Sequence, residues 1–557
     1  MANILGLGGS IHDYAACLLE NEKIIAIEDE RLTRVRYAFG SANPCQVSLN
    51  YCLKYSGLTI QEIDTLIIND DLKSIINTTN FPNQEIINHH LTHAYSTFFT
   101  SSFEESAILI IDGAGSKKFI NEDNEERETT TYAYGNKNSV KTIKKIYGDL
   151  TGYNPVTKSQ TVMSNSLGEF YRVIAETLQL GWLVGPGKVM GLSSYGAYHQ
   201  DDRFVDEIMD YVTLLSEGQF TVKINGKEGL IDKLFLLRQK YHKKEDSFKI
   251  DAAIAYSGQI VFEKILSHLL DYLWTKTRSH NLCLAGGAAL NSIANGKIAR
   301  ISSFKNVHVF FSPGDSGTAV GAAIYGYVNQ KINIPTSHSI RLNLAPFLGR
   351  TYSIEESEKA LKKYGLIYTI PDNLQMQVAV LLSQGNVIAW YQGGSEFGPR
   401  ALGNRSILAD PCNPGMRDHI NLHIKQREWF RPLAPVILDF AMPDYFESPA
   451  FSPWMQFVWP IKSNYKARLP GITHIDGSAR VQTITKKDNP LFYSLIENFY
   501  RVTNVPILLN TSLNIKGQPI VETPEEAIQA FLESDIDSLV INHFLVMKNR
   551  NISTIKF

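Results

Sequence analysis

Three apolar runs, each ending in a glycine-rich turn, constrain the fold of this chain more than any other feature of its sequence. They read NILGLGGS at 3–10, AILIIDGAG at 107–115 and LCLAGGAALN at 282–291. Runs of this kind predict buried strands that lead into loops or helix starts. They lie too far apart for a short tandem repeat but suit a duplicated or two-lobed nucleotide fold. The sequence therefore predicts an α/β protein.

The length of the chain predicts two domains. Single domains usually stop growing near ~250–300 residues, and this chain has 557. At 333–354 turn-forming residues precede the helical pattern EESEKALKKY, so we place the boundary there, with domains at 1–348 and 349–557. The runs NVIAWY, PVILDF, VPILLNTS and SLVIN supply strands for a second α/β domain, and the polar stretch 120–165 predicts a surface hairpin or insertion.

Charge and cysteine content exclude several classes of protein. A net charge of -2 and a pI near 6.7 provide no broad cationic surface, so we expect neither nucleic acid nor membrane as a partner. Five scattered cysteines without a CxxC pair predict neither a disulfide framework nor a thiolate zinc site, and favour the cytoplasm. No basic leader and no run of ~18 apolar residues is present, which predicts a soluble, unprocessed chain.

The segment INHHLTHAYSTFF contains a candidate metal site. His89 and His93 are four residues apart, so on a helix they share one face, whereas His90 would point elsewhere. Asp112, at the end of AILIID, and Asp315, in SPGDSG, could complete the site. Two histidines with carboxylates suit a divalent cation, with iron(II) favoured by analogy and zinc left open. An isolated HxxxH pair more often makes ordinary local hydrogen bonds.

Glycine-rich turns and the polar residues near them are candidates for contacts with a nucleotide phosphate or with the hydroxyl group of an acceptor substrate. Glycines let backbone N–H groups approach a phosphate, although a plain tight turn would use the same residues. His12 could act as a general base, since an unperturbed pKa near ~6.5 leaves a neutral fraction, with a capping or core histidine as the alternative. The candidate nucleotide-binding residues are Ser10, Gly113, Gly286, Gly287 and Asn291.

Basic residues gather in two stretches of the second domain, 393–411 and 424–438, and in GSAR, which ends at Arg480; these stretches are rich in turn formers and do not fit a charged helix face. Arginine forks bind oxygen pairs of phosphate, and a lysine adds a point charge. The residues that could converge on phosphate are Arg400, Arg405, Lys425, Arg431 and Arg480. Asn510 and Ser512, after VPILL, could hold a planar amide such as a carbamoyl group, or form only a polar turn.

Together these segments resemble the NodU/CmcH family of O-carbamoyltransferases over nearly the whole chain. The most specific matching stretches are EFGPRALGNRSI and VMGLSSYG, whereas LAGGAALN is shared with the wider acetate/sugar kinase–Hsp70–actin (ASKHA) superfamily. Other matching stretches are EDERLTRVR, NHHLTHA, IDGAG, SLGEFYRVIAETL, SPGDSGTAVGAA, IKQREWFRPLAPV, IDGSARVQT and NTSLNIKGQPIVETPEEAI.

The resemblance implies an ASKHA-type N-terminal domain, similar to tRNA threonylcarbamoyl transferase, and a YrdC-like C-terminal domain. It implies that ATP, with Mg²⁺, and carbamoyl phosphate give carbamoyladenylate, and that the carbamoyl group then moves to a hydroxyl of a small-molecule acceptor such as a secondary metabolite or sugar. On the matching positions, the metal ligands are His89, His93, Asp112 and Asp315, and the base is His12. The carbamoyl phosphate residues are Arg400, Lys425, Arg431, Arg480, Asn510 and Ser512.

One departure and several rival functions remain. In RLTRVRYAFG, Arg36 and Tyr37 stand where the family would have Lys-His, so that loop receives no assignment. A small-molecule kinase of the same superfamily would not explain the basic stretches of the second domain. An iron-dependent oxidoreductase would have no use for the glycine-rich turns that suit a nucleotide. The near-neutral charge argues against a tRNA threonylcarbamoylation enzyme. An inactive binding protein, the acceptor and the oligomeric state, a homodimer included, are left open.

Overall fold

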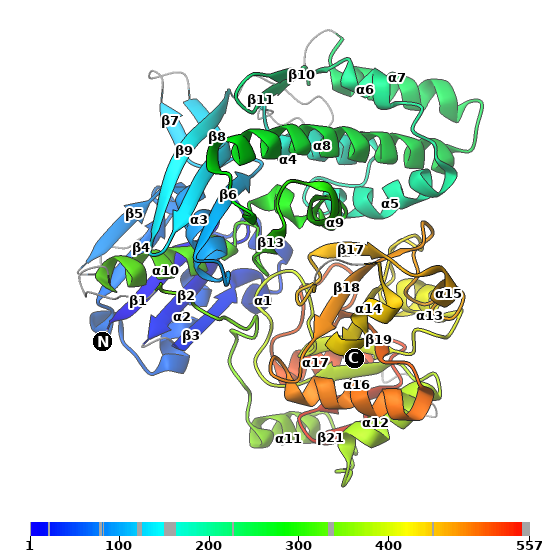
Figure 1. Cartoon of the computed structure of the whole chain (residues 1–557). Coiled ribbons are helices and arrows are strands. Elements are labelled where there is room, and N and C mark those ends of the chain that lie inside the picture. Colours follow the sequence, from blue (N-terminus) through cyan, green and yellow to red (C-terminus); the bar gives the residue numbers. More distant parts are fainter. Residues whose placement is uncertain are drawn as a thin grey trace. The chain divides into compact units, whose positions relative to one another are not determined.

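The computed structural model describes residues 2–20, 23–76, 81, 83–119, 125–149, 163–224, 228–331, 339–447 and 451–548. The chain divides into two compact units (Figure 1). The first contains Met1–Asp29 and Ala38–Leu344, and the second contains Glu30–Tyr37 and Ala345–Phe557. Each unit combines sheets with helices, which confirms the predicted α/β class. In the part of the chain described, no helix combines the length and apolarity that a membrane span requires.

The first unit contains two sheets of the same topology. In each, the first strand has two parallel neighbours on one side and an antiparallel pair on the other. The first sheet has the order β3 (Lys23–Glu28), β2 (Ala15–Glu20), β1 (Asn3–Gly8), β4 (Thr65–Asn69) and β5 (Gln84–Ile87). The second has β9 (Ser139–Asp149), β8 (Glu125–Asn136), β6 (Glu105–Ile111), β12 (Asn281–Ala285) and β13 (Asn306–Val309), and a short sixth strand, β7 (Lys117–Phe119), also pairs with β8. This duplication agrees with the duplicated fold expected from the sequence.

The polar stretch after residue 120 is only partly peripheral. As predicted it forms a hairpin, β8 and β9, although 120–124 and 150–162 lie outside the described residues. Residues 130–136 of β8 nevertheless pair with β6, and the segment 129–133 is buried. Threonines supply most of this buried face, and their polarity concealed a sheet strand in the sequence pattern.

Helices surround the two sheets (Figure 1). Helix α3 (His89–Phe99) begins at Asn88, whose side chain accepts a hydrogen bond from Leu91 N at 3.0 Å. Helix α10 (Gly317–Lys331) packs on α3 and on β1. The other main helices of this unit are α2 (Gln46–Ser56), α4 (Leu167–Thr177), α5 (Gly185–His199), α7 (Leu230–His242), α8 (Ser247–Thr277) and α9 (Ser292–Ile301).

The close packing of α10 on α3 depends on Gly321. A Cβ atom at this position would lie 1.8 Å from the carbonyl oxygen of Thr92. Although Gly→Ala inside a helix usually stabilises by ~0.5–1 kcal/mol, we expect Gly321→Ala to destabilise by about 2 kcal/mol or more through overpacking. Urea unfolding followed by circular dichroism measures this effect. Gly187→Ala is the matched control, because a Cβ at Gly187 meets open space; equal stability of the two variants would contradict the packing argument.

The second unit is built on one mixed eight-stranded sheet. All four apolar runs expected as strands in this half of the sequence are strands. The sheet order is β17 (Phe457–Pro460), β18 (Ser478–Ile484), β16 (Ala434–Leu438), β19 (Ile507–Ser512), β15 (Arg405–Ala409), β14 (Ile388–Tyr391), β20 (Ser538–Ile541) and β21 (Phe544–Met547). Its main helices are α11 (Ile354–Lys363), α12 (Leu374–Ser383), α16 (Pro490–Thr503) and α17 (Pro524–Leu532).

Candidate metal centre and anion site

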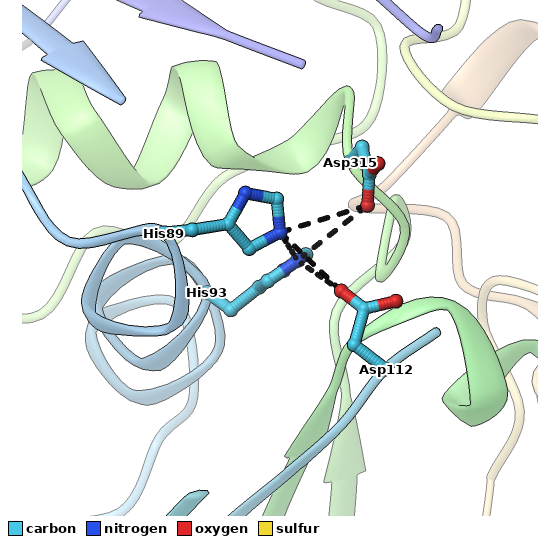
Figure 2. A group of neighbouring side chains, drawn as sticks. All are labelled: His89, His93, Asp112 and Asp315. Carbon is cyan, nitrogen blue, oxygen red and sulfur yellow. Dashed lines mark hydrogen bonds and ion pairs between the residues drawn. The ribbon is translucent and has the colours of Figure 1, made fainter. Parts of the chain in front are cut away.

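Four side chains of the first unit converge on one point (Figure 2). His89 and His93 come from one face of α3, Asp112 follows β6, and Asp315 lies in the loop before α10. The Nε2 atoms of His89 and His93 lie 3.3 and 3.2 Å from Oδ2 of Asp112 and 3.1 Å from each other. One ligand atom from each of the four residues lies within 4.8 Å of the others.

This donor set fits a divalent cation. Atoms bound at about 2.0–2.2 Å to one ion are roughly 3–3.5 Å apart, which is close to the spacing of the two imidazoles and Asp112. All four residues are buried. Burial and the charge of Asp112 raise the pKa of Asp315. Burial also opposes ionisation of Asp112, but hydrogen bonds from the two histidines hold its pKa well below the usual range. A cation would offset the repulsion between the two carboxylates.

Neighbouring groups orient these ligands. Nδ1 of His89 lies 3.2 Å from Oδ2 of Asp71, and the hydroxyl of Ser10 is hydrogen-bonded to Asp315. A polar group behind a ligand fixes its orientation at a metal site. His90 belongs to a different network, since its Nδ1 lies 2.8 Å from the Thr131 hydroxyl and burial lowers its pKa to about 4.

Besides Ser10, three of the candidate nucleotide residues contribute to the candidate metal centre or its turn. The backbone N–H groups of Gly113 and Gly287 donate to Oδ1 of Asp112 at 2.7 and 3.1 Å. Gly286 has a φ of +91°, and a Cβ there would lie 2.3 Å from the carbonyl oxygen of Ile111, so this turn requires glycine.

Asn291, the remaining candidate, has intramolecular partners. Its side chain accepts from Ala294 N at 3.1 Å, which caps α9, and donates to Gln259 at 2.9 Å. Its role in nucleotide binding stays a prediction, as do those of Ser10 and the three glycines.

His12 lies beside the metal centre, with Nδ1 3.0 Å from Oδ2 of Asp13 and 4.0 Å from Oδ2 of Asp315. Burial alone would lower its pKa, but the hydrogen bond to Asp13 and the charges of Asp13, Asp315 and Asp112 raise the pKa to about 9. Without a cation, His12 is therefore mostly protonated at neutral pH, whereas the sequence argument assumed an ordinary pKa. Positive charge at Asp112 and Asp315 would lower the pKa toward the range of a base.

An apolar surface adjoins His12. Its ring lies edge-on to Trp182 at 6.3 Å between centroids, and Trp182 contacts Phe39 at 5.5 Å. Phe39 and Ile11 are 51% and 57% exposed. An acceptor that reaches His12 would meet aromatic side chains, which sequence spacing did not indicate.

The second unit contains a cluster of cations, most of them buried or partly buried and one, Arg36, exposed. Burial, then the charges of Arg400, Arg431 and Arg427, lower the pKa of Arg480 well below its usual range. Burial and neighbouring cations also lower the pKa of Arg400 to about 10 and that of Arg427 to about 9. We call this group the basic cluster; its members, linked by these mutual effects, are Arg36, Arg400, Lys425, Arg427, Arg431 and Arg480.

Sequence reasoning missed two members of the basic cluster. Arg427 lies two residues after Lys425 in IKQREWFR, so its proximity to the others was available from the sequence. Arg36 is distant in sequence, and only the tertiary structure brings it in. Arg405, in contrast, is fully buried; its Nη1 donates to the carbonyl oxygen of Gln392 at 2.6 Å and its guanidinium lies 3.7 Å from the Tyr391 ring centre. We therefore assign Arg405 a structural role.

Polar residues at the end of β19 lie against the basic cluster. The ammonium of Lys425 donates to the Ser512 hydroxyl at 3.0 Å and to the Asn514 carbonyl oxygen at 3.1 Å. Asn510 is 1% exposed, and its amide NH₂ donates to the carbonyl oxygen of Ala401 and to Gln482. Among the described residues, Oδ1 of Asn510 has no hydrogen-bond partner. A buried acceptor of this kind suits a ligand N–H group.

The fold is α/β, with a candidate metal centre in one unit and a candidate anion site in the other. Family models described as Carbamoyltransferase N-terminus and Carbamoyltransferase C-terminus match residues 72–324 and 379–548. The chain belongs to this carbamoyltransferase family and is a carbamoyltransferase, which confirms the resemblance found in the sequence.

Individual relatives cover most of the chain. Uncharacterized protein sll1178 of Synechocystis sp. is 32% identical over 98% of this chain and 97% of its own length. Nodulation protein NolNO of Sinorhizobium fredii is 31% identical over 97% of this chain and 79% of its own length. Among solved structures, full-length HypF in the phosphate- and nucleotide-bound form gives a TM-score of 0.37 at 14% identity, covering 61% of this chain and 56% of that one. We draw no functional conclusion from a likeness of this size.

Proposed function

We propose that this carbamoyltransferase forms carbamoyladenylate from ATP and carbamoyl phosphate in its C-terminal domain, 349–557, and transfers the carbamoyl group to a hydroxyl of a small-molecule acceptor in its N-terminal domain, 1–348. The observation that carries the proposal is the basic cluster, in which burial and mutual repulsion lower the pKa of at least Arg400, Arg427 and Arg480. Bound phosphate oxygens would reverse these unfavourable interactions.

The first step consumes ATP and carbamoyl phosphate, which would both bind at the basic cluster. Hydrolysis of carbamoyl phosphate gives carbamate and phosphate, and a carbamate oxygen then attacks the α-phosphorus of ATP, with pyrophosphate as the leaving group. Arg400, Arg431 and Arg480 would hold the phosphate oxygens, and Oδ1 of Asn510 would accept from the carbamoyl NH₂. Ser512, which is hydrogen-bonded to Lys425, would help to fix the same group.

The second step moves the carbamoyl group to the acceptor. The acceptor oxygen attacks the carbonyl carbon of carbamoyladenylate, the bond to the AMP oxygen breaks, and the hydroxyl proton passes to a base. His12 is the candidate base, and Trp182 provides an apolar wall beside it. A divalent cation held by His89, His93, Asp112 and Asp315 would supply Lewis acidity and charge neutralisation; we favour iron(II) for it, and Mg²⁺ would accompany ATP.

The five cysteines are free thiols, which suits the reducing cytoplasm where we expect this reaction to take place.

An ASKHA-type kinase or an enzyme acting on tRNA is the alternative. One assay separates them: the purified protein is incubated with ATP, Mg²⁺ and carbamoyl phosphate but no acceptor. Pyrophosphate release that requires carbamoyl phosphate supports the proposal. ADP formation, or no turnover, would refute it.

Lys425 makes the first step sensitive to alkaline pH. Burial, then the charges of Arg427 and Arg36, lower its pKa well below 10.5, so its ammonium loses the proton earlier than an ordinary lysine. Because only the charged form binds an anion strongly, we expect KM for carbamoyl phosphate to rise with pH at values below those at which an ordinary lysine loses its proton. Lys425→Arg, which keeps its charge, should show a flatter profile. An unchanging KM in the wild type would contradict this assignment.

A further inference from the structure

Eight residues close to the N-terminus belong to the second compact unit. These residues, Glu30–Tyr37, lie between strands of the first unit in sequence, yet their contacts join them to the unit formed by Ala345–Phe557. We call this segment the clasp. It contains three arginines, Arg31, Arg34 and Arg36, in the stretch RLTRVR. The function proposed above uses Arg36, as a member of the basic cluster, but gives Arg31 and Arg34 no role.

Arg31 fixes the loop that carries Arg400. Its side chain is fully buried, and Nη2 donates to the carbonyl oxygen of Gly398 at 2.6 Å. Gly398 lies two residues before Arg400 and has a φ of +104°, a conformation that favours glycine. Glu396 holds the following part of this loop by accepting from Leu402 N and Asn404 N at 2.7 and 2.8 Å. The buried guanidinium of Arg31 adds a restraint at Gly398.

Arg34 fixes a second loop of the same site. Its Nη1 and Nη2 donate to the carbonyl oxygens of Ile520 and Pro519, both at 2.8 Å, and Nη1 lies 3.2 Å from a carboxylate oxygen of Glu526. One guanidinium thus holds two successive carbonyl groups and the first turn of α17. Its planar fork has the geometry for such multiple contacts.

The loop held by Arg34 continues into the partners of Lys425. The amide NH₂ of Asn514 donates to the carbonyl oxygen of Gln518 at 2.6 Å, immediately before Pro519. The other end of Asn514 accepts from Lys425 and from the Ser512 hydroxyl. The clasp is therefore connected to the loop that carries Arg400 and to the loop whose Ser512 and Asn514 are hydrogen-bonded to Lys425. The charge of Arg36 is among those that lower the pKa of Arg400, Lys425 and Arg431.

We infer that the clasp is part of the anion site. Arg31 and Arg34 are positioning residues: Arg31 holds the loop of Arg400, and Arg34 holds the loop that follows Ser512 and Asn514, the partners of Lys425, in the geometry that binds carbamoyl phosphate. The inference rests on the proposed use of carbamoyl phosphate at the basic cluster. It means that residues 345–557 alone do not form a complete site.

Arg34→Ala tests the inference in the full-length chain, since this side chain is 25% exposed and its loss leaves no large cavity. We expect KM for carbamoyl phosphate to rise about tenfold, the effect of misplacing roughly one charge-assisted hydrogen bond, with a much smaller change in kcat. Millimolar guanidinium should restore part of the affinity. Arg203→Ala is the matched control, because Arg203 also makes several polar contacts but lies in the first unit.

Two further measurements keep the inference open to refutation. Arg31→Lys retains a donor at the fully buried position, and we expect an intermediate KM. Isothermal titration with inorganic phosphate measures the anion site without turnover, so a weaker Kd in Arg34→Ala supports the clasp even if wild type releases no pyrophosphate and the proposed function fails. Unchanged phosphate affinity and KM in both variants, or a loss of activity that only follows the folded fraction, would refute it.

Discussion

Arg480→Ala is expected to reduce carbamoyl-phosphate-dependent pyrophosphate release by about 100-fold or more without loss of stability. The guanidinium is surrounded by other cations, and among the described residues its Nε has no hydrogen-bond partner. Its removal relieves repulsion in the free protein, but it also removes charge from the anion site, where one such group is worth about 2–4 kcal/mol in a transition state. Pyrophosphate release and thermal unfolding are measured on the same preparation.

Arg468→Ala controls for the removal of an arginine from this unit. Arg468 is exposed and donates to the carbonyl oxygen of Asn504, away from the basic cluster. This control should retain wild-type turnover. If Arg480→Ala lost several degrees in Tm and its activity fell only in proportion, Arg480 would be a structural residue and the anion site would need another explanation.

Asp112→Asn is expected to weaken metal binding by about 100-fold and to abolish transfer to an acceptor. Asp112 contacts both histidines, and its other oxygen is oriented by the N–H groups of Gly113 and Gly287. Asparagine keeps the size of the side chain but removes the charge on which a divalent cation depends. Metal content after dialysis against a weak chelator, and titration of iron(II) or zinc into the apoprotein, measure the loss.

The control for Asp112→Asn is Asp251→Asn, which breaks a pair with Arg238 and His242 in the same unit. Its metal content should equal that of the wild type. Pyrophosphate release without acceptor should persist in Asp112→Asn, because the basic cluster lies in the other unit. A variant that still retained stoichiometric metal would exclude Asp112 as a ligand.

Candidate site residues could be chosen from the sequence where their chemistry depends on residues only a few positions apart. The i, i+4 pair of His89 and His93 needs only a helix, and the structure supplies one that begins at Asn88. The partners Asp112 and Asp315 follow a buried strand and precede a helix, positions that an α/β fold brings to one edge of a sheet. Arg400, Arg431 and Arg480 were identified by turn-rich context, which a solvated helix face does not produce.

What the sequence did not predict depends on contacts between distant segments. Nothing local shows that Glu30–Tyr37 belongs with the second unit, or that Arg36 joins the basic cluster. The raised pKa of His12 likewise depends on three carboxylates, two of them remote in sequence. Strand β8 was hidden because buried threonines resemble a polar loop in composition.

Exchange of labelled pyrophosphate into ATP tests the central claim most directly, because it requires reversible formation of the adenylate and no acceptor. Wild type, Arg480→Ala and Asp112→Asn are compared with and without carbamoyl phosphate. The account predicts exchange that depends on carbamoyl phosphate in the wild type, persists in Asp112→Asn and disappears in Arg480→Ala. Exchange retained in Arg480→Ala, or lost only in Asp112→Asn, would contradict adenylate formation at the basic cluster.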